Sequence, residues 1–412
     1  MINFIFLNKM KTNINQFLLY LLIFFSIFQS TESSVNYAII DQYIEELMTG
    51  STAEIPIWNV EKAKAGKKSG WDYIDGCMIM ALLEIYSTTK ADKYLNFADY
   101  YEDYRIADDG TIDGYSKEEW NLDNINGAKN LITLYELTNK LKYRKAAAKI
   151  FQQILGQPRT SEGNFWHKKI YPYQVWLDGL YMALPYYMEY EVLFNNAENI
   201  NDIYNQFFNV YEKMRDPTTG LYYHGYDSTK SIFWANKETG LSQNFWLRAL
   251  GWYSMALLDT LNKANDRGSA NWNKLKNIFV NLCDSMLNFQ DESGMWWQVP
   301  NYPGRAKNYL ETSGSAIYAY SLLKGARTGI LVDNKYREAG KKAFEGICDK
   351  YLTTKNGKLS LGGICLVAGL GPENKPQRDG SYEYYMSESI VEDDAKGVGP
   401  FILAYNEYRL LD

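Results

Sequence analysis

Histidine and cysteine are scarce in this chain of 412 residues, which has two histidines and four cysteines. The cysteines are Cys77, Cys283, Cys348 and Cys365. They lie far apart and lack the close spacing of metal ligands, and His167 and His224 have no cysteine–carboxylate cluster beside them. We therefore predict neither a metal site nor a cofactor. A chain of this length can bury enough surface to fold without disulfides, so free thiols and disulfides both remain open.

Three further absences exclude classes of protein. The net charge is −6 and no basic patch stands out, so we expect no nucleic-acid partner. The glycine-rich stretch at 361–372 lacks the GK[ST] ending of a phosphate-binding loop. Beyond residue 34 no segment is apolar enough to cross a bilayer, so we expect a soluble mature protein without stable membrane association.

The first 34 residues have the pattern of a secretion signal. Lys9 and Lys11 precede an apolar run at 17–28, and small residues follow it. We predict a signal peptide and cleavage region at 1–34, and hence a secreted or periplasmic protein. A retained anchor is the alternative, although the run is short for a membrane span. No A-x-A site marks the cleavage point, and Met10 is an alternative start.

Aromatic residues are abundant, at 16% of the chain, with 35 tyrosines and 11 tryptophans. This exceeds what a hydrophobic core requires. Aromatic faces on a surface can stack on sugar rings, although many of these side chains belong in a core. The composition therefore favours a carbohydrate ligand without establishing one.

One pattern recurs along the chain: a polar group, then glycine, then an apolar helical run. Its copies are at 72–86, 122–138, 176–190, 246–261, 309–325 and 393–411. More polar helical runs, each with one apolar stripe, alternate with them at 91–104, 142–155, 200–215, 272–289 and 335–351. Buried inner helices alternating with amphipathic outer helices predict an all-α (α/α)6 barrel. We assign residues 35–412 to this single catalytic domain, with a first helix at 35–50 and a short hairpin at 220–226.

In such a barrel the inner helices are parallel, so their N-termini emerge at one end. The polar groups at these N-termini are Asp72, Asp75, Asp123, Asp178, Arg248, Glu311 and Lys396. We expect them to converge on a shared site. The alternative for each is that it caps its own helix, where free N–H groups and the helix dipole favour an acidic side chain.

Asp123 and Asp178 begin the second and third inner helices. Neighbouring helices lie about 8–10 Å apart, so both carboxylates could face one small ligand. We expect proximity and burial to raise the pKa of one of the two carboxyls while the other stays ionised, which would supply an acid and a base. Most such acidic pairs, however, are structural.

A second dense segment spans residues 220–252. It contains His224 in GLYYHGYD, and Trp246, Arg248 and Trp252 in SQNFWLRALGW. Helical spacing predicts the guanidinium beside Trp252, a combination suited to an acidic sugar because arginine binds carboxylates and tryptophan stacks on sugar rings. The alternative is a core tryptophan pair with an arginine cap. For His167, substrate binding and a structural role both stay open.

The chain resembles the unsaturated rhamnogalacturonyl hydrolases of glycoside hydrolase family 105. The matching runs include FWHKKIYPYQVWLDGLYMALPYY, GLYYHGYD, ETGLSQNFWLRALGWYSMALLDTL, NYLETSGSAIYAYSLLKGARTG and YEYYMSESIVEDDAKGVGPFILA, in the family's order. The resemblance implies an (α/α)6 barrel that acts on pectin fragments left by polysaccharide lyases. These carry a terminal uronic acid with a C4=C5 double bond, and the family hydrates this vinyl ether instead of displacing the anomeric group.

Carried over residue by residue, the resemblance implies Asp178 as general acid/base with Asp123 as its helper. For this role we expect burial against aromatic residues, with Asp123 nearby, to raise the pKa of Asp178. It implies substrate-binding roles for His167, Lys168, His224, Trp246, Arg248 and Trp252. The first inner helix, WDYIDGCMI, has more acid than expected of the family, which puts contacts from 72–76 in doubt. We expect an unsaturated uronyl oligosaccharide as the partner and a monomer or weak dimer.

Three alternatives remain at this point. An unsaturated glucuronyl hydrolase for glycosaminoglycan or ulvan fragments would use the same fold and chemistry. A non-catalytic sugar-binding toroid is disfavoured by the retained Asp123, Asp178 and Arg248. A sugar epimerase on this fold relies on paired histidines near the axis, whereas both histidines here lie outside the inner helices.

Overall fold

The computed structural model describes residues 35–355 and 357–411. The chain divides into two compact units, residues 1–42 and residues 43–412. The described part of the first unit contains the start of helix α2 (Tyr37–Thr49). This helix matches the one predicted at 35–50. The predicted signal peptide at 1–34 lies outside the described residues.

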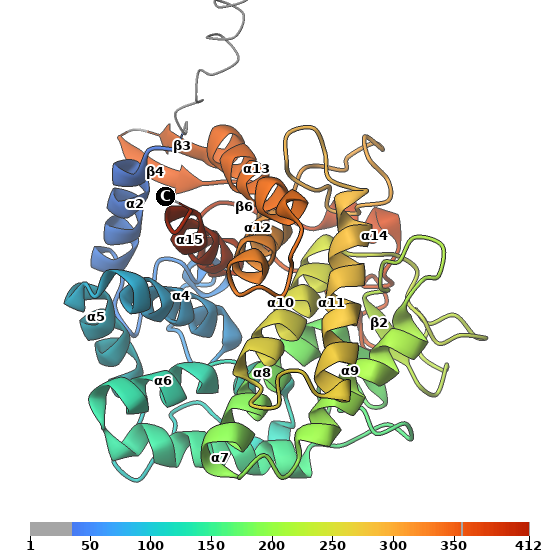
Figure 1. The fold of residues 1–412 in the computed structure, drawn as a ribbon, viewed down its shortest axis with the longest axis horizontal. Helices are drawn as coiled ribbons and strands as arrows, with labels where there is room; N and C mark the ends of the chain where they lie inside the picture. Colours follow the sequence, from blue (N-terminus) through green and yellow to red (C-terminus); the bar gives the residue numbers. More distant parts are fainter. Residues whose placement is uncertain (1–34, 356, 412) are drawn as a thin grey trace, which may run out of the picture. The chain divides into compact units, whose positions relative to one another are not determined.

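In the second unit, the predicted inner helices are confirmed and form a ring. They are α4 (Tyr73–Thr89), α6 (Ala128–Thr138), α8 (Leu177–Phe194), α10 (Leu247–Lys263), α12 (Thr312–Arg327) and α15 (Ala395–Arg409). Each packs on the next in this order, and α15 packs back on α4 (Figure 1). Almost every side chain of α10, α12 and α15 is buried, as expected of helices enclosed on all sides.

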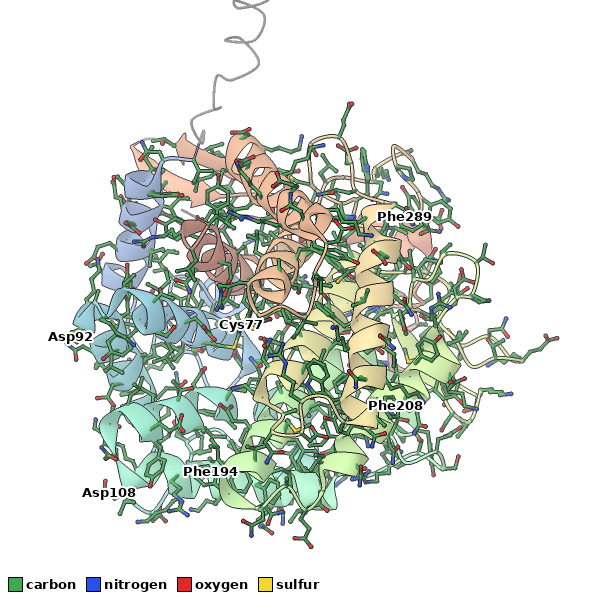
Figure 2. The ribbon with its side chains drawn as sticks, viewed as in Figure 1. Cys77, Asp92, Asp108, Phe194, Phe208 and Phe289 are labelled. Atoms are coloured by element: carbon green, nitrogen blue, oxygen red, sulfur yellow. The ribbon has the colours of Figure 1, made fainter. Side chains whose placement is uncertain are left out.

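Five amphipathic helices pair with the inner helices that precede them. They are α5 (Asp92–Asp103), α7 (Leu141–Gly156), α9 (Ile200–Met214), α11 (Ala270–Leu287) and α13 (Asn334–Tyr351). In α9, Ile203, Phe207, Val210 and Met214 recur at three- and four-residue spacing and are buried. Figure 2 contrasts Cys77, buried on α4, with exposed Asp92 on the outer layer. The all-α (α/α)6 barrel is thereby confirmed.

Shorter elements occupy the connections. The helical ones are α3 (Val60–Lys64), η1 (Lys117–Glu119), η2 (Leu122–Ile125) and α14 (Tyr382–Ser387). The strands are β1 (Gln174–Trp176), β2 (Gly225–Asp227), β3 (Leu352–Lys355), β4 (Lys358–Leu361), β5 (Ile364–Cys365) and β6 (Ile390–Val391). They form antiparallel pairs: β1 with β2, β3 with β4, and β5 with β6.

The prediction of one hairpin at 220–226 is wrong, because the two halves of this segment pair with different parts of the chain. A turn at Gly220, with φ of +74°, closes a bridge between Arg215 and Tyr222. The chain then leaves this bridge, and β2 pairs with β1 from the preceding connection. Sequence reasoning could not find this pairing because its strands are only three residues long and far apart in the chain.

All four cysteines lie in the described residues and have free thiols. Within 35–355 and 357–411, none of the helices combines the length and apolar character needed to cross a membrane.

Candidate active site

The pairing of β1 with β2 brings His224 beside Asp178. Trp176 lies opposite Gly225, and the Leu177 N–H donates to the His224 carbonyl at 3.1 Å. The chain then enters α8, and Asp178 in its first turn places Oδ2 3.1 Å from His224 Nε2. The imidazole is fully buried, whereas the carboxylate keeps 14% of its surface exposed. Asp178 therefore faces a histidine and an open side instead of capping its helix.

The electrostatic surroundings of Asp178 differ from those predicted. Burial alone would raise the pKa of this carboxyl, but the charge and hydrogen bond of His224, with a contribution from His167, outweigh burial and lower the pKa. The expectation of a raised pKa is therefore wrong for the free protein. The reason is geometric, because a histidine and not Asp123 is the group in contact with the acid.

Asp123 belongs to a second pair. It lies in the first turn of η2, where Asn121 caps its N–H at 3.1 Å. Lys168 Nζ lies 2.5 Å from Asp123 Oδ2, and His167 Nε2 lies 3.6 Å from Oδ1. Burial would lower the pKa of Lys168, yet the Asp123 charge raises it above its usual value, so this lysine stays charged. Burial lowers the pKa of His167 to about 4, so this ring is neutral at pH 7.

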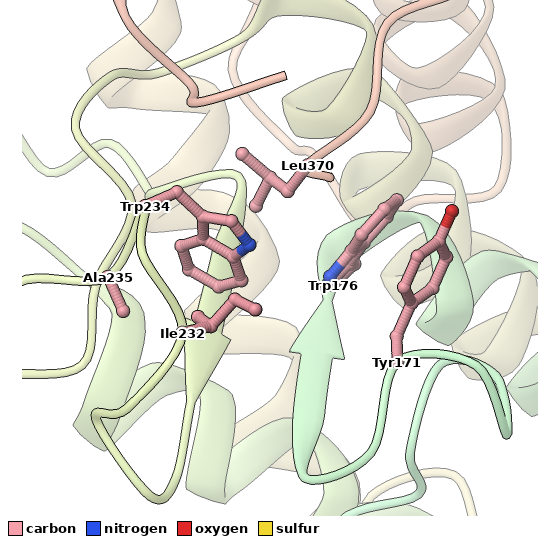
Figure 3. Packing of buried hydrophobic residues seen from close by; sticks show 6 residues of the cluster. All are labelled: Tyr171, Trp176, Ile232, Trp234, Ala235 and Leu370. Carbon is pink, nitrogen blue, oxygen red and sulfur yellow. The ribbon is translucent and has the colours of Figure 1, made fainter. Parts of the chain in front are cut away.

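The Trp176 side chain joins the two pairs. Its ring stacks on His167 at 4.5 Å between centroids and meets His224 edge-on at 5.5 Å. Figure 3 shows the same ring beside Tyr171, with Leu370 and Trp234 nearby. Trp176 was not among the predicted site residues. Its position two residues before Asp178 could have indicated that it belongs to the site.

Two glycines allow this close packing. A Cβ on Gly179 would lie 2.9 Å from His167 Nδ1, and one on Gly225 would lie 2.4 Å from Leu370 Cδ1 and 3.2 Å from Trp176 Cδ1. Any larger residue would displace the rings that orient the two acids.

Arg248, the second residue of α10, supplies a buried cation. Its side chain is 1% exposed, and Nη2 donates to the Cys365 carbonyl. Nη1 has no hydrogen-bond partner among the described residues. The guanidinium lies 5.0 Å from the Trp246 ring, while Trp252 stacks on Tyr181 at 4.7 Å. The ring in contact with the guanidinium is thus that of Trp246, and the placement beside Trp252 stays a prediction.

Tyr385 of α14 is a site residue that sequence reasoning missed. Its hydroxyl lies 2.8 Å from His224 Nδ1, and its ring lies parallel to that of Trp246 at 6.1 Å. Trp246 in turn lies 4.9 Å from the His224 ring. Nothing in the sequence links Tyr385 to His224, which lies 161 residues away.

The remaining polar groups at this end serve the fold. Asp72 caps α4 and Glu311 caps α12, as the capping alternative proposed. Asp75 accepts hydrogen bonds from Trp58 and Asn59 at 2.9 and 3.2 Å. Lys396 pairs with Glu61 at 2.7 Å and also with Asp394. These four groups are thus engaged in helix caps, hydrogen bonds and ion pairs of the fold, and the Glu311 charge also helps to raise the pKa of Arg248.

Comparison with known proteins places this geometry in a family. A family model described as Glycosyl Hydrolase Family 88 matches residues 43–411. The chain belongs to glycosyl hydrolase family 88. A solved glycoside hydrolase from family 105 of C. acetobutylicum ATCC 824 is 41% identical, with a TM-score of 0.82 over 90% of this chain and 99% of its own. The resemblance to family 105 is therefore confirmed, and the chain is a glycoside hydrolase.

Two further relatives of this family 88 chain carry more specific names. The unsaturated rhamnogalacturonyl hydrolase YesR of Bacillus subtilis is 26% identical over 62% of this chain and 71% of its own length. The unsaturated glucuronyl hydrolase of Bacillus sp. GL1, responsible for the degradation of glycosaminoglycan, is 16% identical with a TM-score of 0.61. It covers 90% of this chain and 96% of that one, and at this identity it supports the fold alone.

Proposed function

We propose that this hydrolase releases the unsaturated galacturonyl residue from the non-reducing end of lyase-generated rhamnogalacturonan or pectin oligosaccharides. The observation that carries the proposal is the Asp178–His224 pair at the same end of the barrel as Arg248, a buried arginine whose Nη1 has no partner among residues 35–355 and 357–411. Similarity to a rhamnogalacturonyl hydrolase favours galacturonyl over glucuronyl substrates.

In the proposed reaction Asp178 gives its proton to C4 of the C4=C5 double bond. Water then adds at C5 and returns a proton to the carboxylate, and the resulting hemiketal collapses to open the ring and release the linked sugar. The step requires a protonated Asp178, although His224 favours the ionised form in the free protein. A bound sugar that covers the exposed 14% of this side chain would remove its remaining water, and desolvation favours the protonated acid.

Arg248 is proposed to bind the carboxylate of the unsaturated sugar. A guanidinium presents N–H groups in a fork that matches a carboxylate, and Nη1 is available for this contact. The Trp246 ring, 5.0 Å from the guanidinium and 2% exposed, is proposed to hold Arg248 in place for this contact. Asp123, held by Lys168, is proposed to orient the attacking water, with His167 as its neutral neighbour.

A substrate panel tests this function. Unsaturated galacturonyl–rhamnose is offered beside unsaturated disaccharides from chondroitin, heparin and ulvan, and loss of the double-bond ultraviolet absorbance is followed. We expect the highest kcat/KM on the galacturonyl substrate. Faster turnover of a glucuronyl substrate would favour the glucuronyl alternative, and binding without turnover of any member would favour a sugar-binding toroid.

We also propose that the protein acts outside the cytoplasm after removal of residues 1–34. The support is the sequence pattern of lysines followed by an apolar run. N-terminal sequencing of the mature protein tests it, and a protein that retains Met1 or Met10 would contradict it.

A further inference from the structure

The His224 ring is held at both nitrogens by groups from distant parts of the chain. Nε2 lies 3.1 Å from Asp178 Oδ2, and Nδ1 lies 2.8 Å from the Tyr385 hydroxyl, which is 161 residues away in sequence. Both His224 and Tyr385 are 0% exposed. The imidazole therefore links the Tyr385 hydroxyl to the Asp178 carboxylate through two hydrogen bonds.

Tyr385 is itself firmly placed. Ser381 caps α14 by accepting the Tyr384 N–H at 3.1 Å, and the Tyr384 hydroxyl accepts the Gly369 N–H at 2.9 Å. Burial raises the pKa of Tyr385 well above its usual range, so the phenol keeps its proton. A hydroxyl that keeps its proton can either donate or accept a hydrogen bond, because the O–H bond can rotate.

We propose that Tyr385 is a positioning residue that keeps His224 hydrogen-bonded in both protonation states of Asp178. When Asp178 is ionised, Nε2–H donates to the carboxylate and Nδ1 accepts the phenol proton. When the pair gains a proton it holds two: one on Nδ1, which donates to the phenol oxygen, and one between Nε2 and Asp178. This inference rests on the proposed function only for its consequence in turnover.

The other charged and titratable groups around this pair remain in place when the hydroxyl is removed. His167, with Asp123 and Lys168 behind it, faces Asp178 from the adjoining connection. Asp379, Cys365 and Tyr384 surround Tyr385. A change in the proton affinity of the pair in Tyr385→Phe can therefore be attributed to the lost hydrogen bond.

The sign of that change follows from hydrogen bonding. Without the hydroxyl, the proton-loaded state leaves a buried Nδ1–H unpaired, and orphaned buried N–H groups are rarer than unpaired acceptors. The pair then releases its proton at lower pH. Because the proposed reaction uses protonated Asp178, the alkaline limb of kcat should move down by about half to one pH unit in Tyr385→Phe. At a pH on that limb kcat should fall about three- to tenfold, with KM nearly unchanged.

Two measurements test the proposal. The first compares kcat–pH profiles of the wild type, Tyr385→Phe and the control Tyr186→Phe, which removes a buried hydroxyl that donates to the Ala147 carbonyl at 2.6 Å. The second is a titration of the imidazole ¹⁵N signals, made simple because the chain has only two histidines. In the wild type, at pH values above the alkaline limb, we expect the Nε2–H tautomer of His224. In Tyr385→Phe we expect the ring to take up its proton at a lower pH than in the wild type.

An unchanged limb and an unchanged ring titration in Tyr385→Phe would overturn the proposal, as would equal shifts in both variants. A wild-type ring in the Nδ1–H tautomer above the limb would overturn it even if Tyr385→Phe failed to fold. If no unsaturated sugar is turned over, the proposed function fails while the ring titration still decides the role of Tyr385.

Discussion

The two ends of the inner helices both gather charges, but they use them differently. Where these helices end, Lys324 lies 3.4 Å from Asp259 and 3.6 Å from Glu84, and Arg327 binds Glu407 through two hydrogen bonds of 2.6 and 2.7 Å. Lys324, Asp259 and Glu84 line a cavity of about 230 Å³. Where the helices begin, Asp178 faces a histidine on one side only, and Arg248 has an N–H group without a partner among the described residues.

This difference shows that a cluster of charges beside a cavity is not enough to identify an active site. Lysine and arginine near helix C-termini offset the negative end of the helix dipole, and their acidic partners complete the neutralisation. At the opposite end, incomplete pairing leaves hydrogen-bonding capacity for a ligand. The comparison predicts that substitutions at the beginnings of the helices affect turnover, whereas those at the ends affect stability.

The largest expected effect is that of Asp178→Asn. Asparagine keeps the size of the side chain but cannot give a proton, so kcat should fall by at least about 10²–10⁴-fold, while folding and sugar binding survive. Loss of the double-bond absorbance in a timed assay measures kcat, and calorimetry measures binding.

Asp259→Asn is the matched control at the other end. It weakens the bonds to Tyr320 and Lys324, so unfolding free energy should fall by about 1–3 kcal/mol while kcat stays within about twofold. The contrast between the two ends fails if Asp178→Asn retains turnover or if Asp259→Asn loses it.

Local pattern was sufficient to predict the architecture but not the contacts in the site. Glycine followed by an apolar run located all the inner helices, because burial on every side demands an uninterrupted apolar sequence. The Asp178–His224 contact depends on two three-residue strands, and Tyr385 comes from a six-residue helix near the end of the chain. Such short elements are selected by tertiary packing, which leaves little trace in local sequence.

The next effect in size is that of Arg248→Lys. A lysine keeps the charge but loses the fork that fits a carboxylate, and it leaves the Cys365 carbonyl with an altered partner. We expect KM for the unsaturated substrate to rise about 10–100-fold with a smaller change in kcat. Initial-rate kinetics over a range of substrate concentrations separate the two.

Arg327→Lys supplies the control for Arg248→Lys. Its guanidinium binds Glu407 with 45% of the side chain exposed, so unfolding free energy should change by less than about 1 kcal/mol and KM should not change. A normal KM in Arg248→Lys would remove Arg248 from the proposed carboxylate site.

The smallest expected effect is a change in pH dependence at Lys129, which lines the cavity at the ends of the helices. Its ammonium donates to the Tyr181 carbonyl at 2.9 Å, and burial lowers its pKa to about 7 from 10.5. Between pH 7 and 10.5 the unfolded chain therefore binds a proton that the folded chain does not, so this residue makes stability rise with pH. Lys129→Met should remove a stability gain on the order of 2 kcal/mol between pH 7 and pH 9.

Urea unfolding at pH 7 and pH 9 of the wild type, Lys129→Met and Lys324→Met measures this slope. The acidic partners of Lys324 raise its pKa in spite of burial, so its contribution is fully present at both pH values. Lys324→Met should therefore lose a similar unfolding free energy at each pH. The unfolding free energy of Lys129→Met, relative to that of the wild type, should instead be higher at pH 7 than at pH 9. Equal losses in Lys129→Met at the two pH values would mean that Lys129 is charged in the folded protein, and that this end of the barrel also holds a cation without a carboxylate partner.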